Sequence, residues 1–513
     1  MARLWDKGEG LDEAILRFTV GDDPILDQRL LPYDVLASKA HATMLASCGY
    51  LDAGDAEALC DALDAIEADF EAGQWSIELE DEDVHTAIEA QLIKRVGDLG
   101  ERIHLGRSRN DQVLTAVRLL LKDMAGQLEE AVGHVSDALR DLAKRQGRCF
   151  LPGYTHMQRA MPSSVGGWAN AHAEVLDSNL APIRAARTLA DRCPLGTAAG
   201  YGTPGLKFDR RLTAKLLGFS KVQQPSEAAQ LSRGKAEAAL GFASASLLSD
   251  FGRVAADLCL YATAEFRFVT LPNEFTTGSS AMPQKRNPDV FELIRARAAS
   301  AAGDLMSLMA ITSRLPSGYH RDLQLLKAPL FRIHDSALEC AAILAHALDG
   351  IQFDPKATKR AHEPSLHAAE EAWKLATEEG ITFREAYRRV GEAVDGVIAA
   401  RVKDANPDLL FVGSGGLEAN FLLEALKKIE SNKVTLEVVH SAVGTITESD
   451  VLLASASEAI ILGFHTRIDN GVADVAKREG VQIKLYAIIY ELVDPVKEAM
   501  AGLLDPLIRE VVV

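Results

Sequence analysis

Residues 277–289 read TGSSAMPQKRNPD, and this stretch decides how the rest of the chain is interpreted. A glycine and two serines open it, which predicts a flexible loop with free hydroxyl groups. Pro288 suits the first position of a helix, and the pattern predicts that helix over 289–304. A helix N-terminus offers free N–H groups and the positive end of a dipole, with Lys285 and Asn287 beside it. The stretch therefore indicates an anion-binding loop, with a polar surface turn as the alternative.

Composition favours a large helical protein. The chain has 513 residues, of which 48% are hydrophobic but only 6% aromatic. The formal net charge of -18 argues against a general nucleic-acid or membrane binder, so we expect neither partner. No apolar run approaches the ~18 residues of a membrane span, and the N-terminus lacks the apolar core of a signal peptide. We expect a soluble, cytoplasmic protein.

The 6 cysteines are scattered along the chain without metal-ligand spacing. In a cytosolic protein such cysteines are reduced thiols. The sequence therefore predicts no metal and no other cofactor. With a strongly acidic chain, an anionic substrate would need a locally basic pocket.

The string GSSAMPQKRNP at 278–288 resembles the signature of the fumarase/aspartase superfamily, whose members are lyases that eliminate fumarate. A second string, GRSRNDQ at 106–112, is similar to that of the argininosuccinate lyases. Further likeness to this family lies in DVHT at 83–86, GYTHMQ at 153–158 and YHRDLQLLK at 319–327. Together these strings separate the family from fumarases, aspartases and adenylosuccinate lyases.

The resemblance covers roughly residues 1–400. It implies a mainly α fold with a long-helix bundle of the fumarase/aspartase type. It also implies the reversible β-elimination of argininosuccinate to L-arginine and fumarate, a step in arginine biosynthesis. The assembly implied is a homotetramer in which three protomers contribute to each site.

The resemblance also assigns roles to residues. Ser279, the first serine of the pair, would be the catalytic base, with Ser280 as the alternative. His156 would act as general acid or proton relay, Glu292 would orient it, and Lys285 would stabilise developing negative charge. The residues expected to bind the substrate are His85, Ser108, Arg109, Asn110, Thr155, Asn287, Tyr319, Gln324 and Lys327.

The chemistry implied is the removal of a weakly acidic proton from the carbon beside a carboxylate. Negative charge then moves onto that carboxylate, so catalysis depends mainly on donors placed around it in advance. A free serine is a poor base at neutral pH, so Ser279 must be activated by the cations and the helix end around it.

Two segments depart from the family pattern. TAAGYG at 197–202 follows a family-like PLG, and QLSRGK at 230–235 replaces the usual acidic Ser-Asp-Arg-Asp. Arg233 is therefore left out of the predicted substrate contacts.

Apolar residues at spacings of three and four predict helices throughout this region. The longest, over 111–144, keeps one apolar stripe at near-heptad spacing and would span about 50 Å, which suits a bundle. A break over 149–162 separates it from a helix over 163–193 that is kinked at Pro182. Other predicted helices cover 9–18, 31–48, 55–70, 87–95, 236–268, 291–312 and 334–348.

The periodicity changes near residue 422. Short β-branched runs alternate with helical segments, which predicts a small α/β domain with a largely parallel sheet. VHSAVGTITESD at 439–450 resembles the third domain of the bacterial translation initiation factor GTPase. The chain contains no P-loop motif, so this tail should bind no GTP through such a domain.

Four domains are expected from these patterns, with a linker over 404–416. They are an N-terminal helical domain at 1–105, a central long-helix bundle at 106–350, a small helical domain at 351–415 and the α/β module at 422–513.

Two rival functions remain. The first is a sister lyase that releases fumarate, such as adenylosuccinate lyase, although GRSRNDQ and the segment at 319–327 speak against it. The second is an inactive lyase-like scaffold that carries a translation-linked binding module. Intact Ser279, His156 and Lys285 argue against the scaffold, and the acidic charge argues against RNA.

Overall fold

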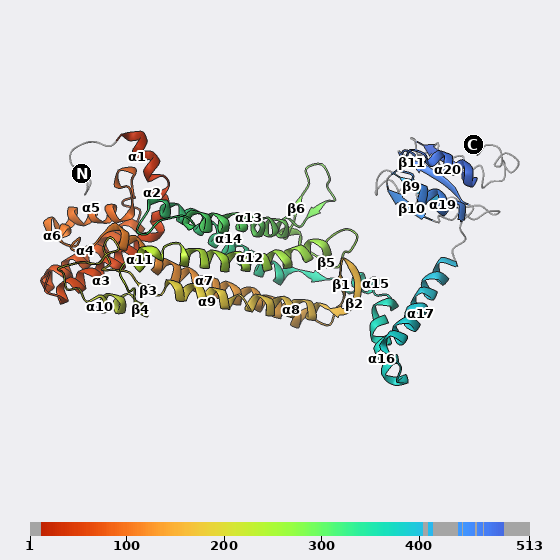
Figure 1. Cartoon of the computed structure of the whole chain (residues 1–513), viewed down its shortest axis with the longest axis horizontal. Coiled ribbons are helices and arrows are strands. Elements are labelled where there is room, and N and C mark those ends of the chain that lie inside the picture. Colours follow the sequence, from red (N-terminus) through yellow and green to blue (C-terminus); the bar gives the residue numbers. More distant parts are fainter. Residues whose placement is uncertain are drawn as a thin grey trace. The chain divides into compact units, whose positions relative to one another are not determined.

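The computed structural model describes residues 12–403, 409–413, 440–443, 445–456, 459–464 and 466–486. The chain divides into two compact units, Met1–Leu366 and His367–Val513 (Figure 1). Among the described residues, no helix is long and apolar enough to cross a membrane. The finer division into four domains stays a prediction.

Unit 1 is a bundle of long helices, which confirms the predicted fold class. The helices pack along much of their length around one apolar core (Figure 1). They are α7 (Arg109–Gln146), α8 (Val165–Asp177), α9 (Leu180–Ala190), α12 (Lys235–Tyr261), α13 (Asp289–Thr312) and α14 (Lys327–Gly350). At about 1.5 Å per residue, the 38 residues of α7 span about 57 Å.

The apolar stripe predicted along α7 is buried, including Leu121, Leu128 and Leu139. The helix begins two residues before the predicted start because Ser108 caps it. The Ser108 Oγ accepts a hydrogen bond from the Asn110 N–H at 3.3 Å. In return, Asp111 Oδ1 accepts one from the Ser108 N–H at 2.9 Å, which completes a capping box.

The helix predicted over 163–193 is two helices, α8 and α9, separated at Ser178 and Asn179. The kink predicted at Pro182 was therefore misplaced. Proline has no N–H to donate to the carbonyl four residues earlier, and its ring clashes there. For Pro182 that residue is Ser178, so the helix breaks at Ser178.

Two hairpins lie at one end of the bundle (Figure 1). Strand β1 (Phe150–Thr155) pairs antiparallel with β2 (Gln158–Ser164), within the predicted break. Strand β6 (Thr277–Gly278) pairs antiparallel with β7 (Arg286–Asn287), and α13 then begins at Asp289 as predicted. Two-residue pairs also join β3 (Arg192–Cys193) to β4 (Lys221–Val222) and β5 (Val269–Thr270) to β8 (Gln352–Phe353).

A second group of helices gathers at the opposite end of the bundle (Figure 1). The helix predicted over 87–95 is α5 and starts at Val84, because the Asp83 carboxylate caps it by accepting from the Thr86 N–H at 2.9 Å. The elements at this end are α1 (Glu13–Val20), α2 (Asp23–Leu26), η1 (Asp27–Leu30), α3 (Leu31–Ser47), α4 (Ala53–Glu71), η2 (Leu79–Asp81), α5 (Val84–Val96), α6 (Asp98–Arg102), α10 (Arg210–Leu216), α11 (Ala228–Leu231) and η4 (Arg321–Leu326).

Two predicted helix ends were wrong. Helix α12 stops at Tyr261 rather than 268 because the chain turns back, and the Phe268 N–H donates to the Tyr261 carbonyl at 2.9 Å. Helix α14 begins at Lys327 rather than 334, directly after η4. Unit 1 also contains η3 (Asn273–Phe275), α15 (Pro355–Arg360) and η5 (Pro364–His367), the last of which ends at the unit boundary.

Unit 2 contains a pair of helices, α16 (Ala368–Glu379) and α17 (Phe383–Lys403), and a parallel sheet. The sheet has the order β10-β9-β11-β12, and it confirms the predicted α/β module. Its strands are β9 (Leu409–Gly413), β10 (His440–Val443), β11 (Ile460–Phe464) and β12 (Ile483–Tyr486), with helices α19 (Glu448–Ala456) and α20 (Val472–Glu479).

The linker predicted over 404–416 was wrong in its centre. Residues Leu409–Gly413 form β9, which pairs with both β10 and β11 and so lies inside the sheet. The run Leu-Leu-Phe-Val is typical of a central strand of a parallel sheet. Parts of the α/β module predicted over 422–513, and residues 9–11 of the helix predicted over 9–18, lie outside the described residues.

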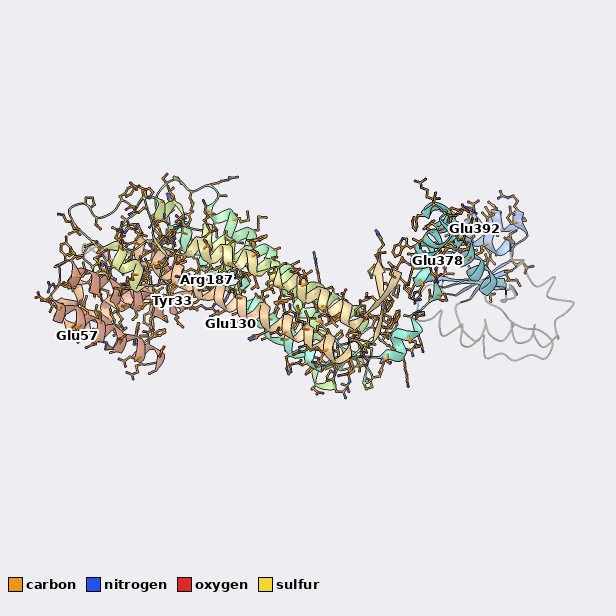
Figure 2. All side chains as sticks on the ribbon, turned by 90° about the horizontal axis from the view of Figure 1, so that it is seen from below. Tyr33, Glu57, Glu130, Arg187, Glu378 and Glu392 are labelled. Atoms are coloured by element: carbon orange, nitrogen blue, oxygen red, sulfur yellow. The ribbon has the colours of Figure 1, made fainter. Side chains whose placement is uncertain are left out.

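Truncating a core side chain of α7 should destabilise unit 1. Leu139 is fully buried, so Leu139→Ala should cost about 2–5 kcal/mol of unfolding free energy. Glu130 is exposed on the same helix (Figure 2), and Glu130→Ala is the control, with an expected cost below about 0.5 kcal/mol. Urea unfolding followed by circular dichroism measures both. Equal losses would contradict the assigned core.

Candidate active site

A cavity of about 170 Å³ lies at the end of the bundle where α7 begins. Its walls come from α2, η1, α5, the first turns of α7, the turn before α12, and η4, which are far apart in sequence. Six of the predicted substrate-binding residues line it: His85, Arg109, Asn110, Tyr319, Gln324 and Lys327.

Arg109 and Asn110 occupy the first positions of α7, so they stand at the positive end of a very long helix. The Arg109 Nη1 atom lies 3.1 Å from Glu82 Oε2 and 3.4 Å from Asp83 Oδ2. Its Nη2 atom has no hydrogen-bond partner among the described residues. The guanidinium group thus keeps a free donor edge beside the cavity, as carboxylate binding requires.

Lys327 is buried and is neutralised by two carboxylates. Its Nζ atom lies 2.7 Å from Asp23 Oδ1 and also contacts Asp27 Oδ1. Burial alone lowers the pKa of Lys327, but the charges of Asp27 and Asp23 raise it above its ordinary value. Burial raises the pKa of Asp23 to about 7, although Lys327 opposes this. This ion cluster joins the N-terminal segment to α14.

Gln324 lines the cavity, but its amide already has partners. Its Nε2 donates to the Thr19 carbonyl at 3.1 Å and to the Val20 carbonyl at 2.8 Å. Arg321 donates to Gln324 Oε1 at 3.1 Å and to the Thr19 carbonyl at 2.8 Å. These bonds attach the end of α1 to η4, so Gln324 holds a wall of the cavity in place.

Arg233 is a cavity residue that the sequence interpretation set aside. Its guanidinium group lies 5.6 Å from the centre of the Tyr319 ring, within cation–π range. Its Nε and Nη1 atoms are buried and have no hydrogen-bond partner in the described parts of the chain. A buried arginine whose donors are free beside a cavity indicates a ligand-binding residue. The sequence did not predict it because the motif at 230–235 departs from the family pattern.

Ser108 does not line the cavity, because its hydroxyl caps α7. The neighbouring Asp111 holds the glycine-rich segment in place. Its Oδ2 accepts from the N–H groups of Gly196 at 2.9 Å and Ala198 at 2.8 Å. Burial raises the pKa of Asp111 to about 6, against these hydrogen bonds. The segment that departs from the family pattern is thus fixed to the start of α7.

The signature loop lies elsewhere, between β6 and β7. The Ser279 Oγ atom accepts hydrogen bonds from the Ala281 N–H at 3.3 Å and the Met282 N–H at 3.1 Å. Lys285 is exposed, and so is Glu292 in the first turn of α13. The Asn287 side chain lies 3.4 Å from Thr277 Oγ1, across the hairpin.

Thr155 and His156 lie at the tip of the β1–β2 hairpin. Thr155 pairs with Gln158, so His156 and Met157 form a two-residue turn. Both have positive φ, 52° and 62°, as type I′ hairpin turns require. Non-glycine residues rarely adopt this conformation, so the hairpin presents an exposed, strained His156. No hydrogen bond or ion pair joins His156 to Glu292 within the described chain.

The predicted site residues therefore form separate groups in one chain. Helix α7 leads from the cavity towards the β1–β2 hairpin over about 57 Å. Helix α13 runs from the signature loop towards Tyr319 over 24 residues, or about 36 Å. Figure 1 accordingly places β1, β2 and β6 at one end of the bundle and α2 and α11 at the other. A single chain does not bring the predicted base and the cavity together.

Known proteins are similar to this chain in sequence and in fold. Residues 16–303 match the family described as Lyase. The chain is 46% identical over 426 residues to the argininosuccinate lyase of Sorangium cellulosum (strain So ce56), covering 83% of this chain and 98% of that protein. The chain belongs to the argininosuccinate lyase family. A second member of the family, from Phocaeicola vulgatus, is 41% identical over 389 residues, which is 76% of this chain and 87% of that one.

The fold of this argininosuccinate lyase family member also matches solved structures. The crystal structure of EDDS lyase in complex with formate is similar with a TM-score of 0.65 and 26% sequence identity. The match covers 76% of this chain and 78% of that chain.

The C-terminal part is similar to a different family. Residues 413–497 match the family described as Translation-initiation factor 2, as the wording of 439–450 predicted. The chain is thus a fusion of a lyase body and a segment similar to an initiation factor.

Removing the charge of Lys327 should destabilise the lyase body. Lys327→Met leaves Asp23 and Asp27 buried without a counter-charge, which should cost about 3–5 kcal/mol at pH 8. Protonation neutralises such carboxylates. The cost should therefore be fully present at pH 8 and should shrink as the pH falls through about 7, where Asp23 takes up its proton, towards 5.

Thermal unfolding at pH 5 and pH 8 measures this effect. Arg332→Met is the matched control, because Arg332 also pairs with a carboxylate, Asp304, but is largely exposed. A loss for Lys327→Met that is the same at both pH values would argue against the buried ion cluster.

Proposed function

We propose that the chain cleaves argininosuccinate reversibly into L-arginine and fumarate by β-elimination. The substrate carries three carboxylates together with cationic guanidinium and ammonium groups. The cavity offers the cations Arg109, Arg233 and Lys327 and, within the same walls, carboxylates such as Glu82 and Asp83. Membership of the argininosuccinate lyase family supports this choice of substrate over a sister lyase.

Ser279 is the proposed base, and its hydrogen bonds are the observation that carries the assignment. Two backbone N–H groups donate to its Oγ atom, and such donors stabilise an alkoxide more than a neutral hydroxyl. No described residue makes a comparable bond to Ser280. Lys285 in the same loop adds positive charge. Ser279 would take the proton from the carbon beside a carboxylate of the succinyl group.

The remaining roles complete the proton balance. The electron pair of the broken C–H bond moves first onto the neighbouring carboxylate and then forms the fumarate double bond as the C–N bond breaks. His156 would give a proton to the departing guanidino nitrogen, with Glu292 of another protomer orienting the ring. Thr155 and Asn287 would donate to carboxylate oxygens, and Lys285 would stabilise the charged intermediate.

A homotetramer with shared sites would join the separated groups. Helix α13 supports such an assembly, because Met306 and Met309, about one turn apart, are each more than half exposed. Neighbouring exposed apolar side chains often mark a surface that a partner covers. Closed two-fold symmetry would bring the signature loop of one protomer to the cavity of another.

A cytoplasmic location is part of the proposal. All 6 cysteines are free, as in a reducing compartment.

Fumarate release should be seen as rising ultraviolet absorbance after argininosuccinate is added. Ser279→Ala should lower kcat about a thousand-fold, because the base is lost while the binding groups remain. Ser280→Ala is the matched control one residue away and should retain most activity. Equal losses in both variants would move the base assignment away from Ser279. A folded wild type that releases no fumarate would refute the proposed function.

Inactive variants should complement one another. In a mixture of Ser279→Ala and Arg109→Met chains, a site built from two protomers can receive an intact loop and an intact cavity. Random reassembly after gentle denaturation should restore about a quarter of the wild-type activity. Each variant refolded alone is the control. Persistent inactivity, with subunit exchange verified by mass spectrometry of differently tagged chains, would exclude sharing between these two groups.

A further inference from the structure

Two buried residues at the cavity wall form an acid–imidazole pair. The His85 Nδ1 atom, near the start of α5, lies 3.0 Å from Asp34 Oδ2 in α3. The His85 side chain is 4% exposed and that of Asp34 is 1% exposed, so water does not screen the pair.

Only one side chain of the pair reaches the cavity. His85 lines the cavity and Asp34 does not, so the imidazole ring stands between the carboxylate and the cavity. The Nδ1 contact with Asp34 is an ion pair, and neither ring nitrogen makes a hydrogen bond of good geometry among the described residues, so Nε2 is left without a partner. A buried donor left in this state is costly unless a ligand satisfies it.

We propose that Asp34 is a positioning residue, which holds the His85 ring through Nδ1 and so directs Nε2–H at a carboxylate of the bound substrate. The role rests on the proposed function and adds a residue to it. An imidazole whose one nitrogen is fixed by a carboxylate presents the other nitrogen in a fixed orientation and is favoured in its charged form.

The surroundings of His85 favour the imidazolium. Burial alone lowers the pKa of His85, but Asp34 raises it, as do Asp83 at the start of α5 and Asp27 of η1, and the result lies above the ordinary value. The cations Lys327 and Arg109 also line the cavity, and the charge of Asp34 acts on the buried cation Arg107 as well. His85 therefore stays charged until the pH rises through its raised pKa, and Nε2–H then remains a donor to an anion.

Asp34→Asn tests the role, because the amide keeps the shape and an oxygen acceptor but removes the charge. The imidazolium should then be lost at a lower pH. We expect the Kd for fumarate and the KM for argininosuccinate to rise about ten-fold at pH 8 and less than about three-fold at pH 6. Ser38→Ala is the control: Ser38 is buried one turn along α3 and bonds Arg107 at 2.8 Å, not His85. Its pH profile should match the wild type.

A double-mutant cycle separates positioning from general damage to the fold. If Asp34 acts through His85, adding Asp34→Asn to His85→Gln should change the Kd by less than two-fold. Asp23 titrates in the same range, but its contribution persists in the His85→Gln background. An additive loss, or an Asp34→Asn loss that is equal at pH 6 and pH 8, would overturn the role.

Calorimetric titration of the full chain with fumarate makes the outcome independent of turnover. A wild type that binds fumarate without cleaving argininosuccinate would refute the proposed function, while the pH dependence of its Kd would still decide the role of Asp34. A wild type that does not bind fumarate at either pH would overturn the role of Asp34 directly. If Asp34→Asn does not fold, His85→Gln serves as the second variant. Because this change removes the imidazole, the Kd for fumarate should no longer vary with the titration of His85.

Discussion

The fixed rise of the α-helix is the constraint on which the structure depends. Because α7 advances about 1.5 Å per residue for 38 residues, the groups at its two ends are about 57 Å apart. The cavity lies at one end, and His156 and the signature loop lie at the other. The same long helices that bury the core also keep the two halves of the proposed machinery apart within one chain.

Charged side chains at the two ends of the helix bundle differ in how they are paired. Around the cavity, cations are matched by buried carboxylates: Lys327 with Asp23 and Asp27, and Arg109 with Glu82. Carboxylates thus compensate the charges of Lys327 and Arg109 inside the cavity of an acidic chain. At the hairpin end, Lys285 and Glu292 are exposed. The charged groups of the cavity are thus held by contacts within the chain, whereas these two face solvent.

The C-terminal module has an apolar core of its own. Small and β-branched side chains, such as Ile446, Ile461 and Val472, pack against one another within the described residues of unit 2. Strand β9 shows where the sequence alone misplaced the start of this module. A five-residue apolar run after a long helix looked like part of a linker until pairing with β10 and β11 placed it inside the sheet.

The sequence by itself determined the family, the helical fold and the residue types of the site, because these depend on local spacing and on strings such as GSSAMPQKRNP. It could not determine that Ser108 serves as a cap, that Gln324 is engaged by the backbone of α1, or that Arg233 lines the cavity. Asp34 and His85, far apart in sequence, meet only through the packing of α3 against α5. Such contacts depend on how distant segments pack, which no local pattern encodes, so only the tertiary structure decided them.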